Sequence, residues 1–219
     1  ILIAFGNVEI IDEKENIFVK SQKITYLKKS ELILTDGKSK AISEGVTIDA
    51  DNFEYNKFKK IVNAYGNVKI DNQEENYLIF ADEATYQKNK ELFLTKGKSK
   101  AINEDIVINA NNFQYNKIAN ILNAKGNVEI ENTINNYFIS TNEATYFKNS
   151  EKIITQGETK ANIRSKYFIT SKDVTYLNKE KIISSQNKTK LEDKKSQVYF
   201  VDKFNFSMNQ EILKGENFL

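Results

Sequence analysis

The chain has 219 residues, of which 40% are hydrophobic and 28% are charged, a balance typical of a folded globular protein. Its 32 basic and 30 acidic residues leave a net charge of only +2, which argues against a general nucleic-acid binder. Because cysteine and histidine are both absent, disulfides, thiolate metal sites and histidine-based catalysis are excluded. No basic-then-apolar leader precedes the strand-like segment Ile1–Ile10, so we expect the chain to begin within a longer gene product.

One short motif recurs from the start of the chain onward. It occupies Ala4–Ile10, Ala64–Ile70 and Ala124–Ile130, with 60 residues between copies. Aromatic residues recur every 29 to 31 residues, at Tyr26, Tyr55, Tyr86, Tyr115, Tyr146, Tyr176 and Phe206. Eleven residues after each of the first six comes a glycine or its usual substitute, at Gly37, Gly66, Gly97, Gly126, Gly157 and Asn187. This spacing predicts about seven copies of a two-strand unit of roughly 30 residues, with an unusual backbone conformation at each of these positions.

The repeated units have the periodicity of β-strands. Around Gly66, every second residue from Val62 to Ile70 is apolar or small, while the residues between them are mostly polar. This period of two indicates a strand with one buried face. The polar segments Gln87–Glu91 and Asn116–Asn120 are too short for a helical crossover, so antiparallel hairpins are expected.

A phase slip marks the same place in successive units. Val46, Ile48 and Ala50 share one face, and the apolar series then continues after a three-residue step at Phe53 and Tyr55. Such a slip would turn the apolar set to solvent unless a bulge or sharp bend restored the phase. The slip therefore predicts strands that fold over at a corner into two walls, in an all-β single domain spanning residues 1–219.

Two motifs carry a resemblance to a known family. Ala81–Tyr86, followed by a hairpin and Leu94–Ala101, and Asn109–Tyr115, running into Leu122–Val128, resemble the OstA-like domain of bacterial lipopolysaccharide transport. The resemblance covers nearly the whole chain and implies an elongated antiparallel β-jelly-roll, V-shaped, with an open apolar groove. The two final units diverge most from the pattern, so register and groove shape are least well defined after Arg164.

The resemblance also implies a function and a location. Domains of this family lie in the periplasm of Gram-negative bacteria, join edge to edge, and pass lipopolysaccharide toward the outer membrane with its lipid A acyl chains in the groove. The chain is most similar to the periplasmic N-terminal domain of the outer-membrane translocon, with the soluble bridge protein as the other possibility. Expected partners are therefore lipopolysaccharide, homologous β-jelly-rolls and an outer-membrane β-barrel in the same chain, with no nucleic acid and no cofactor.

The inward-facing apolar stripe is the first candidate site. Under the transport hypothesis it lines the lipid groove, and under the alternative it is an ordinary core. The small residues in this stripe, such as Ala64, Thr95 and Ser99, either leave space between the walls or let the walls pack closely. The candidate groove residues are Ile48, Phe53, Tyr55, Val62, Ile79, Ala84, Tyr86, Ile108, Phe113, Tyr115, Leu122, Val128, Ile139, Tyr146 and Ile169.

Two further surfaces are candidates. The terminal segments Ile1–Ile10 and Phe204–Met208 are expected to be open sheet edges that pair with a like domain. Basic residues that alternate with the apolar stripe point away from it, and they either form a solvated face or bind lipid phosphates. These residues are Lys38, Lys40, Lys96, Lys98, Lys100 and Lys160.

Catalysis has little support in the sequence. The adjacent carboxylates Asp82–Glu83 and Glu104–Asp105 would face opposite sides of a strand, so neither pair converges on one site. No nucleophile–base pair, phosphate loop or metal cluster is present, and the chain is not expected to be an enzyme. A purely structural or adhesive β-repeat with a closed, dry core remains the alternative to lipid transport.

Overall fold

A computed structural model describes residues 1–217 of the chain. The chain divides into two compact units. The N-terminal unit contains residues 1–104 and 112–118, and the C-terminal unit contains residues 105–111 and those from 119 onward. The organisation as a single domain stays a prediction.

Nearly every element of the described residues is a β-strand. The N-terminal unit contains β1 (Leu2–Asp12), β2 (Ile17–Leu27), β3 (Leu32–Asp36), β4 (Ser39–Ser43), β5 (Val46–Ala50), β6 (Asn52–Asn56), β7 (Ile61–Asn72), β8 (Tyr77–Gln87), β9 (Leu92–Lys96), β10 (Ser99–Asn103) and β12 (Asn112–Asn116), with the 3-10 turns η1 (Lys28–Ser30) and η2 (Lys88–Lys90). The C-terminal unit contains β11 (Ile106–Ala110), β13 (Ile121–Asn132), β14 (Tyr137–Phe147), η3 (Lys148–Ser150), β15 (Lys152–Ile163), β16 (Tyr167–Lys172), β17 (Thr175–Leu177), β18 (Ile182–Ser185), β19 (Thr189–Asp193), β20 (Val198–Val201), β21 (Lys203–Ser207) and β22 (Ile212–Glu216).

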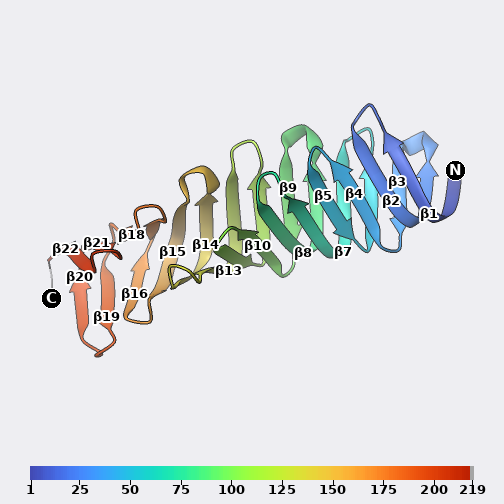
Figure 1. Ribbon diagram of the computed structural model, residues 1–219. Helices are drawn as coiled ribbons and strands as arrows, with labels where there is room; N and C mark the ends of the chain where they lie inside the picture. The colour runs from blue at the N-terminus through green and yellow to red at the C-terminus, as the bar shows by residue number, and fades with distance from the viewer. Residues whose placement is uncertain (218–219) are drawn as a thin grey trace. The chain divides into compact units, whose positions relative to one another are not determined.

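The long strands of the N-terminal unit each belong to two walls. The first half of β8 pairs with β10 and its second half pairs with β9, and β2 divides in the same way between β4 and β3. We call the wall that contains β4, β5 and β10 the β4 wall, and the wall that contains β3, β6, β9 and β12 the β3 wall. The strands β2, β4 and β5, drawn in blue, lie side by side in Figure 1. Every one of these pairings is antiparallel, as the hairpin lengths predict.

The walls meet at a corner where the register shifts. In β7 the shift falls between Tyr65 and Val68, and it contains Gly66 (φ 73°) and Asn67 (φ 49°), both in the left-handed region. The chain also breaks between β5 and β6, where the N–H of Asp51 donates to the carbonyl of Gly66 over 2.9 Å. The apolar residues that flank this break, Ala50 and Phe53, are buried. The corner predicted from the phase slip is therefore confirmed.

Buried hydroxyl groups replace the interrupted strand pairing inside the corner. Thr95 and Ser99 share a hydrogen bond of 2.6 Å, and the N–H of Phe113 donates to the Thr95 hydroxyl over 2.9 Å. Thr35 and Ser39, 60 residues earlier in the chain, show the same arrangement with the same 2.6 Å separation. Because buried polar groups are costly without partners, these hydroxyls explain why small polar residues interrupt the apolar stripe at the corner.

The C-terminal unit follows the same plan with shorter strands toward its end. β14 pairs with β13 and β15 along its whole length. The two short strands β16 and β17 both pair with β15, and together they take the place of one long strand in the earlier units. The expectation of an unusual backbone at Asn187 is wrong, because this residue is not in the left-handed region. Its side-chain amide instead donates to the carbonyl of Lys172 over 3.2 Å, so a side-chain hydrogen bond ties the strands together where earlier units use glycine.

Replacing Gly97 with alanine should destabilise the corner by more than the equivalent change at Gly157. Both glycines have φ near +80° (72° and 82°), which costs any L-residue about 1–2 kcal/mol. A Cβ at Gly97 would also lie 2.3 Å from Oδ2 of Asp82 and 3.1 Å from its Cβ, whereas nothing lies within 4 Å of one at Gly157. We expect Gly97→Ala to lower the free energy of unfolding, measured in urea, by about 1 kcal/mol more than Gly157→Ala does. This difference is the lower end of what overpacking usually costs. Equal losses at the two positions would show that Asp82 moves aside freely.

Candidate functional site

All fifteen residues of the predicted groove are buried. Their exposed fractions range from 0% for Val128 and Ile139 to 6% for Ala84. Nine belong to the N-terminal unit, and Ile108, Leu122, Val128, Ile139, Tyr146 and Ile169 belong to the C-terminal unit. The period-2 pattern thus identified the inner face of both walls, and the binding of lipid by this face stays a prediction.

Aromatic rings fill much of the interior and join the two walls. In the N-terminal unit, Tyr86 stacks on Phe93 with ring centroids 4.3 Å apart. Tyr77 of the β4 wall contacts Tyr115 of the β3 wall edge to face at 5.0 Å. In the C-terminal unit, Tyr137 meets Tyr176 at 4.5 Å. Because these rings occupy the space between the walls, the interior is well packed in the conformation described.

A small cavity remains between the walls of the N-terminal unit. It measures about 10 Å³ and is lined by Ile17, Ala41, Ser43, Val46 and Ile48 from the β4 wall and by Lys60, Val62, Tyr86 and Lys88 from the β3 wall. This volume is about the least that can hold one water molecule. An acyl chain therefore enters this space only if the walls move apart.

Charged turns line the mouth of the N-terminal unit, on the side away from the corner. The turns of the β4 wall are mainly acidic and those of the β3 wall mainly basic, and ion pairs join the two rims. Lys57 lies 3.2 Å from Asp12, and Lys60 lies 2.9 Å from Glu15. Lys117 lies 4.0 Å from Glu75 across the mouth, and 3.5 Å from Glu91 on its own rim. Although burial acts to lower it, the hydrogen bond and charge of Asp12 raise the pKa of Lys57.

These rim residues were not predicted from the sequence. Their signal is the alternation in charge of successive turns, from Asp12–Glu15 to Lys28–Lys29, then Glu44, then Lys57–Lys60. In the C-terminal unit the signs of the two rims are exchanged at one place, with the basic residues in the turn before β16 and the acidic residue in the turn before β22. There Glu211 lies 2.9 Å from Lys166 and 3.6 Å from Arg164. The hydrogen bond from Lys166 lowers the pKa of Glu211.

Several buried tyrosines lie close to these charges. Burial raises the pKa of Tyr55, and the nearby carboxylates of Asp12 and Glu15 raise it further. The Tyr86 hydroxyl donates to Glu91 over 2.9 Å, and burial together with this hydrogen bond raises the Tyr86 pKa. Each phenol therefore stays neutral to a higher pH than an exposed tyrosine would.

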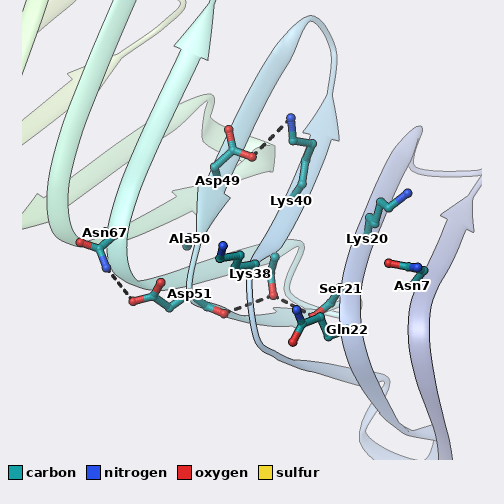
Figure 2. Close-up of a pocket in the computed structure, with 11 residues that line it drawn as sticks. Asn7, Lys20, Ser21, Gln22, Lys38, Lys40, Asp49, Ala50, Asp51 and Asn67 are labelled. Carbon is teal, nitrogen blue, oxygen red and sulfur yellow. Dashed lines mark hydrogen bonds and ion pairs between the residues drawn. The ribbon is translucent and has the colours of Figure 1, made fainter.

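The outward lysines face away from the buried stripe. All six are exposed, and two of them pair with carboxylates, Lys40 with Asp49 at 3.4 Å and Lys96 with Glu83 at 3.6 Å. Lys38 and Lys40 border an outer pocket of about 440 Å³ that also contains Lys20 and Asp51. Figure 2 shows Lys40 reaching toward Asp49 at this pocket. Binding of lipid phosphates by these lysines stays a prediction.

The strand edges differ in part from expectation. Within the described residues of the N-terminal unit, β1 pairs with β2 and with no second strand, and its Leu2, Ile3 and Phe5 are exposed. At the other end, the expectation for Phe204–Met208 is wrong, because β21 pairs with both β18 and β22. The open strands among the described residues of the C-terminal unit are β20 and β22, where Val198, Tyr199, Phe200 and Ile212 are exposed.

The carboxylate pairs have partners that suit a structural role. Glu83 pairs with Lys96, and Asp105 accepts hydrogen bonds from Asn132 at 2.5 Å and Asn135 at 3.3 Å. Within residues 1–217, no group of three or more acidic side chains is placed to hold a metal ion. No helix in this part of the chain is long and apolar enough to cross a membrane.

Comparisons with known proteins identify the fold. No family model matches the chain, and no curated protein matches its sequence. Among solved structures, the chain is similar to LptH from Pseudomonas aeruginosa, the LptA-homologous periplasmic component of the lipopolysaccharide transport device, with a TM-score of 0.51 and 11% identity. The similarity covers 56% of this chain and 98% of LptH. The chain therefore shares with LptH the β-jelly-roll fold that its motifs imply.

Proposed function

We propose that this chain is a periplasmic carrier of lipopolysaccharide that holds lipid A acyl chains between its two walls. The observation that carries the proposal is the β-jelly-roll fold shared with LptH, a component of a lipopolysaccharide transport device. The apolar inner face supports it, because each buried methylene contributes about 0.8 kcal/mol and several acyl chains would bind tightly without polar contacts. The side chains that fill the interior would have to separate as lipid enters.

The proposal includes assembly by strand pairing. The strand β1 in one unit and the strands β20 and β22 in the other offer unpaired backbone groups and exposed apolar side chains. Such edges are suited to pairing with a strand of another sheet. We propose that a homologous β-jelly-roll binds there and that lipid passes along the joined interiors toward the outer membrane.

A closed structural or adhesive repeat is the second candidate. The buried state of the inner face and the small size of the cavity favour it. In this case the apolar interior would only stabilise the fold, as in other repeat proteins whose neighbouring units share a continuous core.

Photocrosslinking in cells would separate the two functions. A photoreactive residue would replace Phe113 or Tyr86 on the inner face, with exposed Lys98 as the outward control. We expect lipopolysaccharide adducts at the two inner positions and none at Lys98. Equal labelling at all three, or none in a folded protein, would contradict lipid carriage and favour the closed repeat.

The same experiment tests strand pairing through a probe at Phe5, which is 73% exposed on β1. We expect this probe to crosslink to another β-jelly-roll protein, whereas the probe at Lys98 should not. Lipid adducts without protein adducts at Phe5 would support carriage and contradict assembly through β1.

A further inference from the structure

Four charged side chains close the mouth of the N-terminal unit above its cavity. Lys60 and Lys88 come from turns of the β3 wall, and Glu15 and Glu44 come from turns of the β4 wall. The ammonium of Lys60 lies 2.9 Å from the Glu15 carboxylate, and that of Lys88 lies 3.4 Å from Glu44 and 4.0 Å from Glu15. Lys88 also donates a hydrogen bond to the backbone carbonyl of Glu15. We call these four residues the mouth cluster.

The two lysines of the mouth cluster belong to the cavity as well as to the rim. Both line the 10 Å³ hollow together with Val46, Ile48 and Tyr86. Lysine commonly packs its aliphatic stem against apolar surface while its ammonium reaches polar surroundings. The site therefore places two cations at the entrance to an apolar space, which is the arrangement that an amphiphile with an anionic headgroup requires.

The burial of two members of the mouth cluster, Lys88 and Glu15, is not explained by stability alone. The side chains of Lys88 and Glu15 are only 13% and 12% exposed. Desolvation of such a pair offsets much of its Coulombic attraction, and well-packed apolar residues in its place are often as stable or more so. Charged residues that cover the interior at this position therefore point to a second role besides stability.

We propose that Lys60 and Lys88 form a headgroup site for an anionic amphiphile, and that Glu15 and Glu44 occupy this site when the protein is empty. The inference rests on the proposed lipid-carrying function and adds the chemistry of headgroup recognition to it. When the walls part, phosphate-like oxygens replace the two carboxylates on the lysines while the chain enters between the walls. The lysines keep anionic partners throughout, so the exchange leaves no cation unpaired.

Calorimetric titration with two probes of equal chain length would test this site. Dodecyl phosphate supplies the anionic headgroup and dodecyl maltoside a neutral one, both used below their micelle concentrations. The double variant Glu15→Gln/Glu44→Gln removes the competing carboxylates, and we expect it to bind dodecyl phosphate about tenfold more tightly than the wild type. Lys60→Gln/Lys88→Gln is added to that variant, so that removing the lysines leaves no carboxylate buried without its partner. We expect this fourfold variant to lose the tenfold gain in affinity for dodecyl phosphate, while its affinity for dodecyl maltoside changes little.

A matched control comes from the same two turns. Lys59 and Lys90 are exposed and neighbour the mouth cluster, so Lys59→Gln/Lys90→Gln makes the same change in net charge without touching the cavity. We expect these substitutions, made in the Glu15→Gln/Glu44→Gln background, to leave dodecyl phosphate affinity within about twofold, because exposed charges are well screened.

Two outcomes would overturn the headgroup site while leaving lipid carriage intact. Equal weakening by the mouth and control substitutions would show only a general attraction to positive charge. Tighter binding of both probes when the mouth lysines are removed would show that the cluster only holds the walls together. If neither probe binds any variant that is folded by circular dichroism, both the headgroup site and the proposed function fail.

Discussion

The N-terminal unit should unfold cooperatively as the pH rises above about 10, the ordinary pKa of tyrosine. Burial raises the pKa of Tyr55, Tyr77 and Tyr86 well above that value in the folded protein. Above pH 10 the unfolded chain releases phenolic protons that the folded chain retains, so unfolding becomes more favourable as pH increases. The stabilisation from these three groups is thus fully present below about pH 10 and is lost as pH rises toward their folded-state values.

The expected loss is large relative to the stability of a domain. Each buried tyrosine contributes about 1.4 kcal/mol per pH unit above its unfolded pKa, and the three together contribute about 4 kcal/mol per unit. Typical domains are stable by only about 5–15 kcal/mol.

Simultaneous measurement of tyrosinate absorbance and far-ultraviolet circular dichroism would check this expectation. The part of the tyrosinate absorbance that comes from the buried rings should rise together with the loss of circular dichroism, because these rings ionise only as the strands separate. Tyr86→Phe removes one of the three groups and should make the loss of stability with pH shallower by about 1.4 kcal/mol per unit. Ionisation of the buried tyrosines with native circular dichroism would show that hydroxide reaches the interior without unfolding.

Phe93→Ala should destabilise the N-terminal unit by about 3–5 kcal/mol. The Phe93 ring is 1% exposed, stacks on Tyr86 at 4.3 Å and lies 6.4 Å from the ring of Tyr115. Its loss would leave a cavity between three strands of the β3 wall and remove both ring contacts. Urea unfolding followed by circular dichroism would measure the change.

Phe58→Ala is the matched control for that substitution. Phe58 is 72% exposed in the turn between β6 and β7, so the same change of side chain should alter stability by no more than about 0.5 kcal/mol. A loss below about 1 kcal/mol for Phe93→Ala would indicate that the walls close over the space, and that the interior is more adaptable than its packing implies.

Local patterns in the chain were sufficient to predict the strands and the corner. The alternation from Val62 to Ile70 defines which face of β7 is buried, because a strand turns successive side chains to opposite sides. The three-residue step from Ala50 to Phe53 located the break between β5 and β6, because one buried face cannot continue through a phase slip without a bend. The same rules identified the inner-face residues of both units.

The terminal strands depended on pairing that no local pattern encodes. Phe204 and Phe206 alternate with polar residues, as they would in a strand at the edge of a sheet. The strand that contains them nevertheless pairs with β22. Asn187 occupies the repeat position of a glycine, yet its side chain rather than its backbone conformation completes the corner. Whether a given strand has a further neighbour is decided by the rest of the sheet, and not by its own composition.

The sequence by itself determined the all-β fold, the two-walled repeat and the buried face, because these follow from periodicities within a few residues. Only the tertiary structure decided which turns meet at the mouth. Lys88 contacts Glu15 across 73 residues of chain, because folding at the corner brings the two rims together. Long-range ion pairs of this kind depend on the distance between the walls, which no local sequence pattern specifies.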